Sequence, residues 1–262
     1  MNSSFSEIQY DVRGSAAWIV LDRPREMNAM TSVMLDGIAR ALDAAAGDAS
    51  VRAVVITGNG DTAFCAGADL KQVLAPGTPG EPDFLDRAAA TLGRLRDFPK
   101  PAIAAVNGLT LAGGLELVLC CDLVVAADHA RMGDAHANFG VFPGAGGAAV
   151  LPRRLGPTRA KYLLYTGEQV SAVQMCEWGL VNEVVPGAEL HARVAALAEK
   201  IASKSPLVLR QMKRVADAAL DLPRDAALAN ELLTLRTHLR SHDLQEGLAA
   251  FREKRPPRFA GR

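Results

Sequence analysis

Short, almost continuous apolar runs recur through the first half of the chain. They are Ala16–Leu21, Ala53–Thr57, Ile103–Val106 and Leu123–Ala127, and turn-forming residues directly follow the first two. Runs without polar alternation are typical of strands that are buried on both faces. The pattern therefore predicts a sheet that is covered by other elements on both sides.

Segments with helical spacing separate these runs. Thr31 precedes a segment whose apolar residues recur about every four positions, as on one face of a helix. Further helices are expected at about Phe84–Arg96 and at Leu115–Cys121. Residues 75–82 are rich in Pro and Gly, so we expect an exposed, mobile loop there. The alternation of strands and helices predicts an α/β fold.

The pattern changes near residue 190. From Leu190 to Phe251 the chain has helical spacing and no convincing strand. We therefore expect a core domain at residues 1–195 and a helical region at residues 196–262. Apolar faces on these last helices would suit packing between subunits.

Composition and charge narrow the function classes. Lys plus Arg and Asp plus Glu number 29 each, so the balance favours neither nucleic acid nor an anionic membrane surface. The four cysteines lack metal-ligand or disulfide spacing, which fits a reducing cytoplasm and predicts no metal site. The first residues do not resemble a signal peptide, and no apolar run is long enough for a membrane span.

Three glycine-rich stretches carry the candidate chemistry, at residues 64–71, 107–116 and 139–147. In the second, a strand leads into Gly113 and then into an apolar helix. Glycine permits close approach of a ligand, and the first turn of a helix has unpaired N–H groups that favour an oxyanion. Glu116 is expected in that first turn, where a carboxylate can act as acid or base. Alternatively, the glycines only allow tight packing and Glu116 only complements the helix dipole.

These stretches resemble the signatures of the crotonase superfamily, the enoyl-CoA hydratase/isomerase family. The matching segments are AFCAGADLK, AVNGLTLAGGLEL with CCDLVVAA, and FGVFPGAGG, in the family's order and spacing. RPREMNAMT and GLAAFREKRPPRF resemble the family's terminal segments, so the likeness covers nearly the whole chain. The resemblance implies a spiral of ββα units, followed by helices that form a homotrimer or a hexamer made of two trimers.

The same resemblance implies roles for individual residues. The N–H groups of Ala68 and Gly113 would form an oxyanion hole, and Glu116 would be the first catalytic glutamate. The CoA part of the substrate would lie along Met27, Ala29, Ala66, Asp69, Leu70 and Lys71. Phe251, Lys254 and Arg255 would complete the CoA site of a neighbouring subunit. No separate cofactor is implied, because coenzyme A is part of the acyl-CoA thioester substrate.

One position departs from the hydratase pattern. The second catalytic glutamate would fall at His136. Histidine also transfers protons near neutral pH, but it directs its nitrogen differently from a carboxylate. The alternative is that His136 only forms a hydrogen bond within the pocket.

The expected activity is that of an enoyl-CoA hydratase or isomerase. CoA-thioester hydrolysis and decarboxylation are reachable from the same enolate, and the pair Glu116 and His136 does not choose among them. Phe84 and Leu85 are expected near the acyl end of the substrate.

Three other interpretations are weaker. Gly58-Asn59-Gly60 mimics a dinucleotide fingerprint, but no helix is expected to open at Gly60, which disfavours an NAD-dependent oxidoreductase. A serine hydrolase is disfavoured because every serine lies outside residues 51–170. A non-catalytic acyl-CoA binder stays open because His136 replaces a glutamate.

Overall fold

A computed structural model describes residues 3–75 and 77–262, and two sheets organise its core. The larger sheet has seven strands in the order β1-β2-β3-β4-β6-β8-β11. These are Ser3–Phe5, Ile8–Arg13, Ala16–Leu21, Ala53–Gly58, Ala102–Val106, Leu123–Ala127 and Glu183–Val185. The first three pair antiparallel, and all pairs from β3 to β11 are parallel.

The smaller sheet has four strands in the order β10-β9-β7-β5. They are Val170–Ser171, Arg131–Gly133, Leu109–Leu111 and Ala63–Cys65. Three times the chain passes directly from a strand of the large sheet to a strand of the small one, from β4 to β5, from β6 to β7 and from β8 to β9. These repeated two-strand units agree with the ββα arrangement that the resemblance implied.

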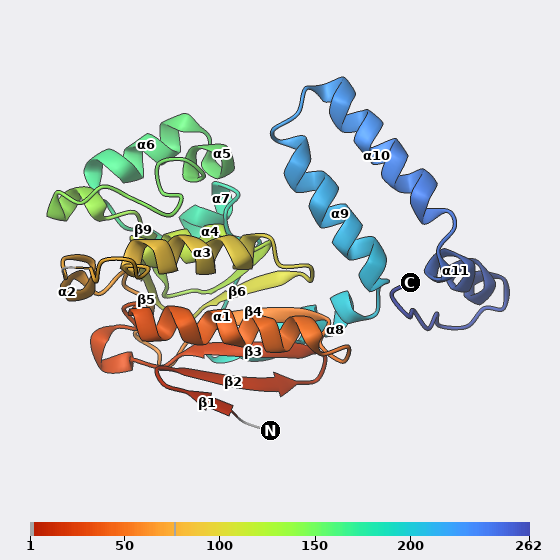
Figure 1. Ribbon diagram of the computed structural model, residues 1–262, viewed down its shortest axis with the longest axis horizontal. Helices are drawn as coiled ribbons and strands as arrows, with labels where there is room; N and C mark the ends of the chain where they lie inside the picture. Colours follow the sequence, from red (N-terminus) through yellow and green to blue (C-terminus); the bar gives the residue numbers. More distant parts are fainter. Residues whose placement is uncertain (1–2, 76) are drawn as a thin grey trace.

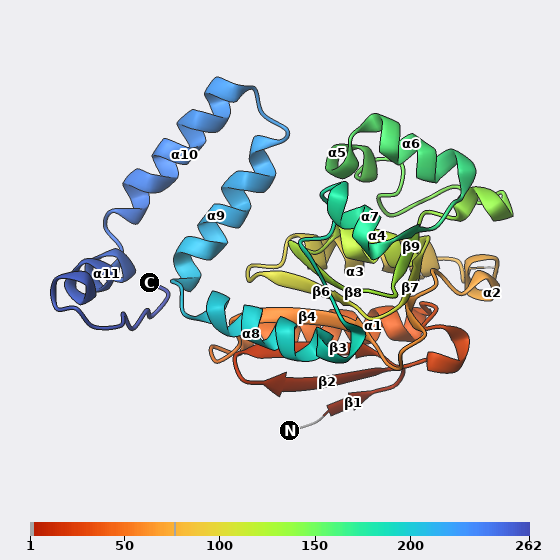
Figure 2. The same cartoon turned by 180° about the vertical axis from the view of Figure 1, so that it is seen from behind.

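Helices cover both faces of the large sheet, as its apolar strands require. Helix α1 (Ser32–Gly47) packs on one face with α3 (Phe84–Arg96) beside it, and α8 (Leu190–Ala202) packs on the other (Figures 1 and 2). Every residue of β3, β4 and β6 is buried. The expected bounds of β3 and α3 are confirmed, and Thr31 caps α1 by accepting a hydrogen bond from the Met34 N–H at 3.0 Å.

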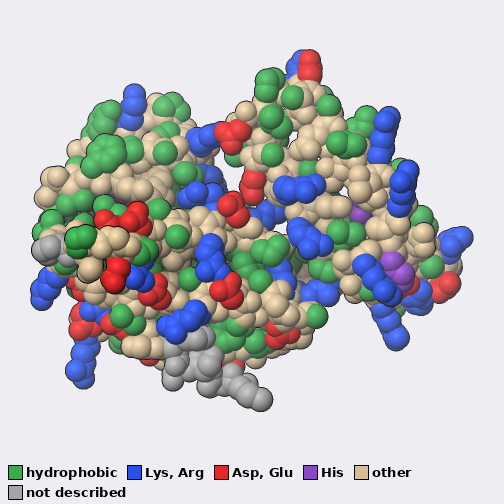
Figure 3. All heavy atoms as spheres, in the orientation of Figure 1, with side chains coloured by type: hydrophobic (Ala, Val, Ile, Leu, Met, Phe, Trp, Pro, Cys, Tyr) green, Lys and Arg blue, Asp and Glu red, His purple; other side chains and the backbone are tan. Residues whose placement is uncertain are grey.

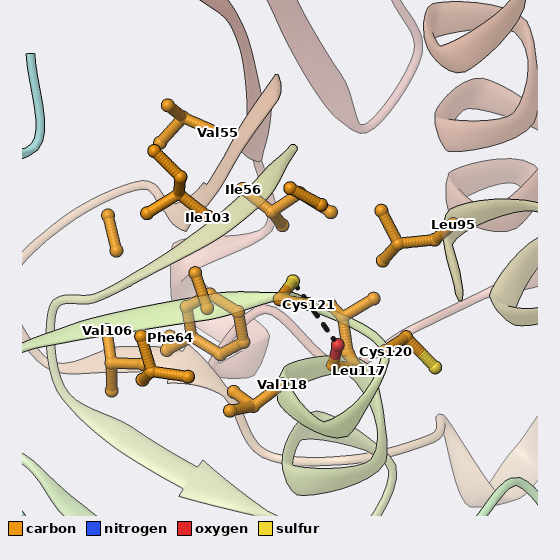
Figure 4. Packing of buried hydrophobic residues seen from close by; sticks show 14 of the residues in the cluster. Val55, Ile56, Phe64, Leu95, Ile103, Val106, Leu117, Val118, Cys120 and Cys121 are labelled. Atoms are coloured by element: carbon orange, nitrogen blue, oxygen red, sulfur yellow. Dashed lines mark hydrogen bonds between the residues drawn. The ribbon is translucent and has the colours of Figure 1, made fainter. Parts of the chain in front are cut away.

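The core between the two sheets is shown from close by in Figure 4. Phe64 of β5 lies near Val118 of α4 (Gly113–Leu119) and near Cys121, whose thiol donates to the Leu117 carbonyl at 3.6 Å. Cys65, Cys120 and Cys121 are buried, and burial raises the pKa of the Cys65 thiol to about 12. These thiols are packing residues rather than nucleophiles.

Shorter helical elements lie between the strands and the longer helices along the core. They are η1 (Pro24–Glu26), α2 (Leu70–Val73), η2 (His136–Phe139), α5 (Leu151–Leu155), α6 (Pro157–Thr166), α7 (Ala172–Glu177) and η3 (Gly187–Glu189). The expected loop at residues 75–82 is exposed at all of its described positions, and residue 76 lies outside the described residues. Within the described chain, no helix has both the length and the apolar character needed to cross a membrane.

Three helices follow the core and extend away from it: α9 (Pro206–Ala219), α10 (Arg224–His238) and α11 (His242–Arg252) (Figure 1). The expected boundary between residues 195 and 196 falls inside α8, which contacts β4, β6 and β8 along the sheet.

Candidate active site

The carboxyl ends of three neighbouring parallel strands bring the predicted site residues together. Strands β5, β7 and β9 lie side by side in the small sheet and run in the same direction. Ala68 follows β5, Gly113 follows β7, and His136 follows β9. The carboxyl ends of parallel strands are the usual place for ligands in α/β folds, because loops and helix N-termini converge there.

The N–H groups of Ala68 and Gly113 belong to two backbone segments in close approach. A Cβ placed on Gly113 would lie 3.4 Å from the Ala68 nitrogen and 2.8 Å from Cε of Met30. Neither N–H donates a hydrogen bond to a described residue. Gly113 is also the first residue of α4, where the helix dipole adds to the field of the N–H. The pair can therefore receive a carbonyl oxygen that gains negative charge.

Backbone strain and tight packing hold this pair in place. Ala112, between β7 and α4, has φ 49° and ψ −120°, a conformation that favours glycine. A Cβ on Gly114 would lie 2.0 Å from the carbonyl oxygen of Cys65, so only glycine lets α4 approach β5 this closely. The two segments that carry the N–H pair are thus locked against each other.

Glu116 lies in the first turn of α4 and is buried, with 4% of its surface exposed. Its Oε1 accepts hydrogen bonds from the N–H groups of Ala145 at 2.7 Å and Gly147 at 2.9 Å. Oε2 has no hydrogen-bond partner in the described chain, and it is not sealed from solvent. One carboxylate oxygen is therefore fixed by the third glycine-rich stretch, and the other is available to a substrate. The carboxylate bonds to this loop rather than to the N-terminus of its own helix.

His136 begins η2 and its side chain is 11% exposed. Its Nδ1 lies 3.0 Å from Oδ1 of Asp134, and Nε2 has no partner among the described residues. Burial would lower the pKa of His136, but the hydrogen bond to Asp134 and the charges of Asp134 and Glu116 outweigh it and raise that pKa. Asp134, which contacts His136, and Glu116 both lie beside Gly147, since a Cβ there would be 2.6 Å from Asp134 Oδ2 and 3.4 Å from Glu116 Oε1, so these side chains belong to one site.

The expected CoA-binding segments lie alongside each other. The Ala66 N–H donates to the Met27 carbonyl at 3.0 Å, and Arg23 donates to the Ala29 carbonyl at 2.7 Å. Arg23 also pairs with Asp69 at 3.3 Å. The Asp69 carboxylate also caps α2, so it joins α2 to Arg23.

The other expected contact residues are at the surface. Leu70 and Lys71, on α2, are exposed. Leu85 is exposed but Phe84 is a core residue with 7% of its surface exposed, so Leu85 is the one of the two that faces out. Phe251 is 83% exposed on α11, while Arg255 forms a two-point ion pair with Glu246 at 2.6 and 2.9 Å.

Sequence reasoning missed Asp134 and the roles of the Ala145 and Gly147 N–H groups. Asp134 stands two residues before His136, and this spacing was the available signal. The backbone donors of the loop could not be assigned, because their contact with Glu116 spans about thirty positions and depends on the fold.

Comparisons with known proteins agree with this geometry. The family model described as Enoyl-CoA hydratase/isomerase matches residues 11–262. The chain is 38% identical over 252 residues to 2,3-dehydroadipyl-CoA hydratase of Escherichia coli, covering 93% of this chain and 94% of the relative. It is 35% identical over 256 residues to crotonyl-CoA hydratase of Syntrophomonas wolfei, covering 98% of both.

A solved structure shares the same architecture. The enoyl-CoA hydratase from Bacillus anthracis superimposes with a TM-score of 0.92 at 36% identity, covering 98% of this chain and 100% of that chain. This likeness confirms the expected α/β class and the expected superfamily. The chain belongs to the enoyl-CoA hydratase/isomerase family of the crotonase superfamily.

Proposed function

We propose that the protein adds water to the double bond of an α,β-unsaturated acyl-CoA thioester. The observation that carries this proposal is the state of Glu116. Two backbone N–H groups hold one carboxylate oxygen, and the other is unpaired in a site that also contains His136 and the free N–H pair. A fixed carboxylate with one available oxygen is suited to take a proton from a water molecule.

The proposed reaction proceeds through a thioester enolate. The thioester oxygen lies between the N–H groups of Ala68 and Gly113. Water bonds to Cβ through its oxygen and loses a proton to Glu116, while the electrons of the double bond move toward the thioester oxygen. The two N–H groups and the dipole of α4 stabilise the negative charge there. Cα then receives a proton from His136, and the proton on Glu116 returns to His136 through solvent. This sequence needs no cofactor beyond the CoA of the substrate.

The imidazole of His136 also fits other reactions of the same family. An imidazole has one free nitrogen where a carboxylate has two oxygens, so it does not position water in the same way. Isomerisation, thioester hydrolysis or decarboxylation through the same enolate are the alternatives. Binding of acyl-CoA without turnover is a further outcome of the test.

An activity screen over CoA esters tests the proposal directly. Crotonyl-CoA, a 3-enoyl-CoA, a saturated acyl-CoA and a malonyl-type ester are each incubated with the protein and analysed by mass spectrometry. We expect a gain of one water on crotonyl-CoA, with the rate lowered strongly by Glu116→Gln and less strongly by His136→Ala. Loss of carbon dioxide, loss of the acyl group or a shifted double bond without water would replace hydration by the corresponding alternative. Turnover that is unchanged in both variants would refute the roles of these residues.

We further propose that CoA lies along Met27, Ala29, Ala66, Asp69, Leu70 and Lys71. The support is that hydrogen bonds join the segment around Met27 to the segment around Ala66, next to the N–H of Ala68. Lys71→Ala is expected to raise KM for CoA esters with little change in kcat. Equal KM values in the variant and the wild type would contradict this path.

A homotrimer, or a hexamer of two trimers, is the proposed assembly. Helices α9 and α10 enclose an apolar groove of about 700 Å³, and hydrophobic side chains lie at the surface of this part of the molecule (Figure 3). The exposed side chains include Met212, Leu228, Leu232 and Leu235. In the assembly, Phe251, Lys254 and Arg255 are proposed to reach the CoA site of a neighbour. Light scattering should give three or six subunits for the wild type and a smaller species for Leu232→Asp.

The proposed location is the cytoplasm. Its support is the set of four free cysteines, three of them buried, which a reducing compartment preserves. Imaging of a fluorescent fusion in the native cell tests this location, and an organellar signal would contradict it.

A further inference from the structure

Asp134 is a buried carboxylate inside the site for which the proposed reaction assigns no role. It follows β9 directly and is 1% exposed. Its Oδ1 lies 3.0 Å from Nδ1 of His136 and 3.4 Å from the backbone nitrogen of the same residue. Its Oδ2 is buried and has no hydrogen-bond partner in the described part of the chain. A buried carboxylate is costly unless its charge is compensated, so this position requires a physical reason.

The surroundings of Asp134 place it close to the catalytic carboxylate. A Cβ on Gly147 would lie 2.6 Å from Oδ2 of Asp134 and 3.4 Å from Oε1 of Glu116. The two acids therefore flank the same glycine, and Asp134 also contacts the His136 ring. Because Gly147 has no side chain, the loop can donate its N–H to Glu116 while leaving room for Asp134.

We propose that Asp134 is a positioning residue that acts through His136, holding the imidazole with Nδ1–H toward Oδ1 and Nε2 toward the acyl group. This inference rests on the proposed function, in which His136 delivers a proton to Cα. A carboxylate on Nδ1 fixes the tautomer of the neutral ring and stabilises the charged ring. Asp134 and His136 together then supply the acid that a second glutamate would supply.

The charges around His136 support the assignment of an acid. Asp134 comes from the segment after β9 and Glu116 from α4, and these two carboxylates act on the ring and raise its pKa. Helix α6 packs against η2 and carries Arg159, Lys161, Tyr162 and Tyr165. Of these, Arg159 and Tyr162 contact Trp178, and Lys161 and Tyr165 are exposed. Asp134 and Glu116 are therefore the charged groups that act on the His136 ring.

Asp134→Asn tests the inference, because asparagine keeps the shape and the acceptor oxygen but removes the charge. We expect kcat for enoyl-CoA hydration at neutral pH to fall about tenfold or more, with KM within about threefold. The alkaline limb of the kcat profile should move to lower pH, since the neutral variant no longer supports the imidazolium. An unchanged kcat and an unchanged alkaline limb would overturn the inference.

The chain contains a matched control. Asp128 lies beside His129 at the surface, with 3.4 Å between Oδ1 and Nδ1, and both side chains are more than half exposed. Asp128→Asn removes a similar aspartate–histidine contact away from the site. It should leave kcat and the pH profile unchanged.

Nitrogen NMR of the histidine-labelled wild type provides a second measurement that does not depend on a variant folding. We expect the neutral form of His136 to carry its proton on Nδ1, and the Nε2–H tautomer would overturn the inference. If the wild type hydrates none of the esters, the proposed function fails. The tautomer and the His136 titration in Asp134→Asn still decide the positioning role.

Discussion

The substitution Glu116→Gln separates the role of Glu116 as a base from its role in holding the loop at Ala145 and Gly147. Glutamine has nearly the same shape, and its amide oxygen can accept the same two N–H groups, from Ala145 and Gly147. What it loses is the basic oxygen, because an NH₂ group replaces Oε2. We therefore expect the side chain to stay in place and kcat to fall by about 10² to 10⁴.

The stability change can be bounded from the same contacts. Hydrogen bonds to a charged group contribute about 1.5–3 kcal/mol each, and neutral ones about 0.5–1.5 kcal/mol, so two bonds lose about 2–3 kcal/mol when the corresponding ends of the two ranges are compared. Removal of a buried charge near Asp134 offsets part of this loss. Glu116→Ala instead leaves two buried N–H groups unpaired, at about 1–3 kcal/mol each, and adds a cavity. Glu116→Gln should therefore be clearly more stable than Glu116→Ala.

The assay is the loss of absorbance of the conjugated enoyl thioester, with urea unfolding for each variant. Glu183→Gln serves as a control, since Glu183 pairs with Arg193 at 2.7 Å on the surface. It should retain full activity and lose less than about 1 kcal/mol. Activity of Glu116→Gln within a factor of a few of the wild type would refute the role of Oε2. Equal destabilisation by Gln and Ala would refute the two-donor account.

Four further predictions concern the site and its frame. Gly113→Ala places a methyl group at the N–H pair and should lower kcat/KM by about 10²-fold or more, with little change in the unfolding midpoint; normal activity would contradict the position of the pair. Gly114→Ala pushes a methyl against the Cys65 carbonyl and should destabilise by about 3 kcal/mol in urea unfolding, whereas a neutral effect would mean that the close approach is absent. Ala112→Gly relieves the positive φ and should stabilise by about 1 kcal/mol, so a less stable variant would argue against strain there. Because the pKa of His136 is raised above 6.5, protonation of its ring stabilises the fold fully below pH 6.5, and this stabilisation is lost as pH rises through the raised pKa. The free energies of unfolding of the wild type and of His136→Gln, measured in urea, should therefore converge at high pH. A difference that stays constant with pH would contradict this expectation.

The frame of the fold was predictable where one local pattern decides the outcome. Strand β3 is apolar throughout because both of its faces are covered, and α3 begins and ends where Asp83 caps it and Asp97 follows it. The apolar runs that became β4, β6 and β8 stood out for the same reason. The helix expected from Leu115 begins two residues earlier, at Gly113, because the first turn has few apolar residues to reveal it.

The short strands and the contacts between the site residues were not predictable from the local sequence pattern. Strands β5, β7 and β9 have three residues each, which is too few to show a period. The family resemblance identified Ala68, Gly113 and Glu116 as site residues. Their positions relative to one another depend on the order in which these strands lie in the small sheet. Asp134 had no local signal beyond its spacing from His136, because its importance comes from burial.

In the proposed reaction, the N–H groups of Ala68 and Gly113 polarise the thioester carbonyl. Isotope-edited infrared spectroscopy detects this polarisation, with ¹³C at the thioester carbonyl of crotonyl-CoA bound to Glu116→Gln, in which turnover is slow enough for the complex to be recorded. We expect a lower C=O stretching frequency in the complex than in water, and a return toward the free value when Gly113→Ala is added. A bound carbonyl with the frequency of the free ester would contradict the claim.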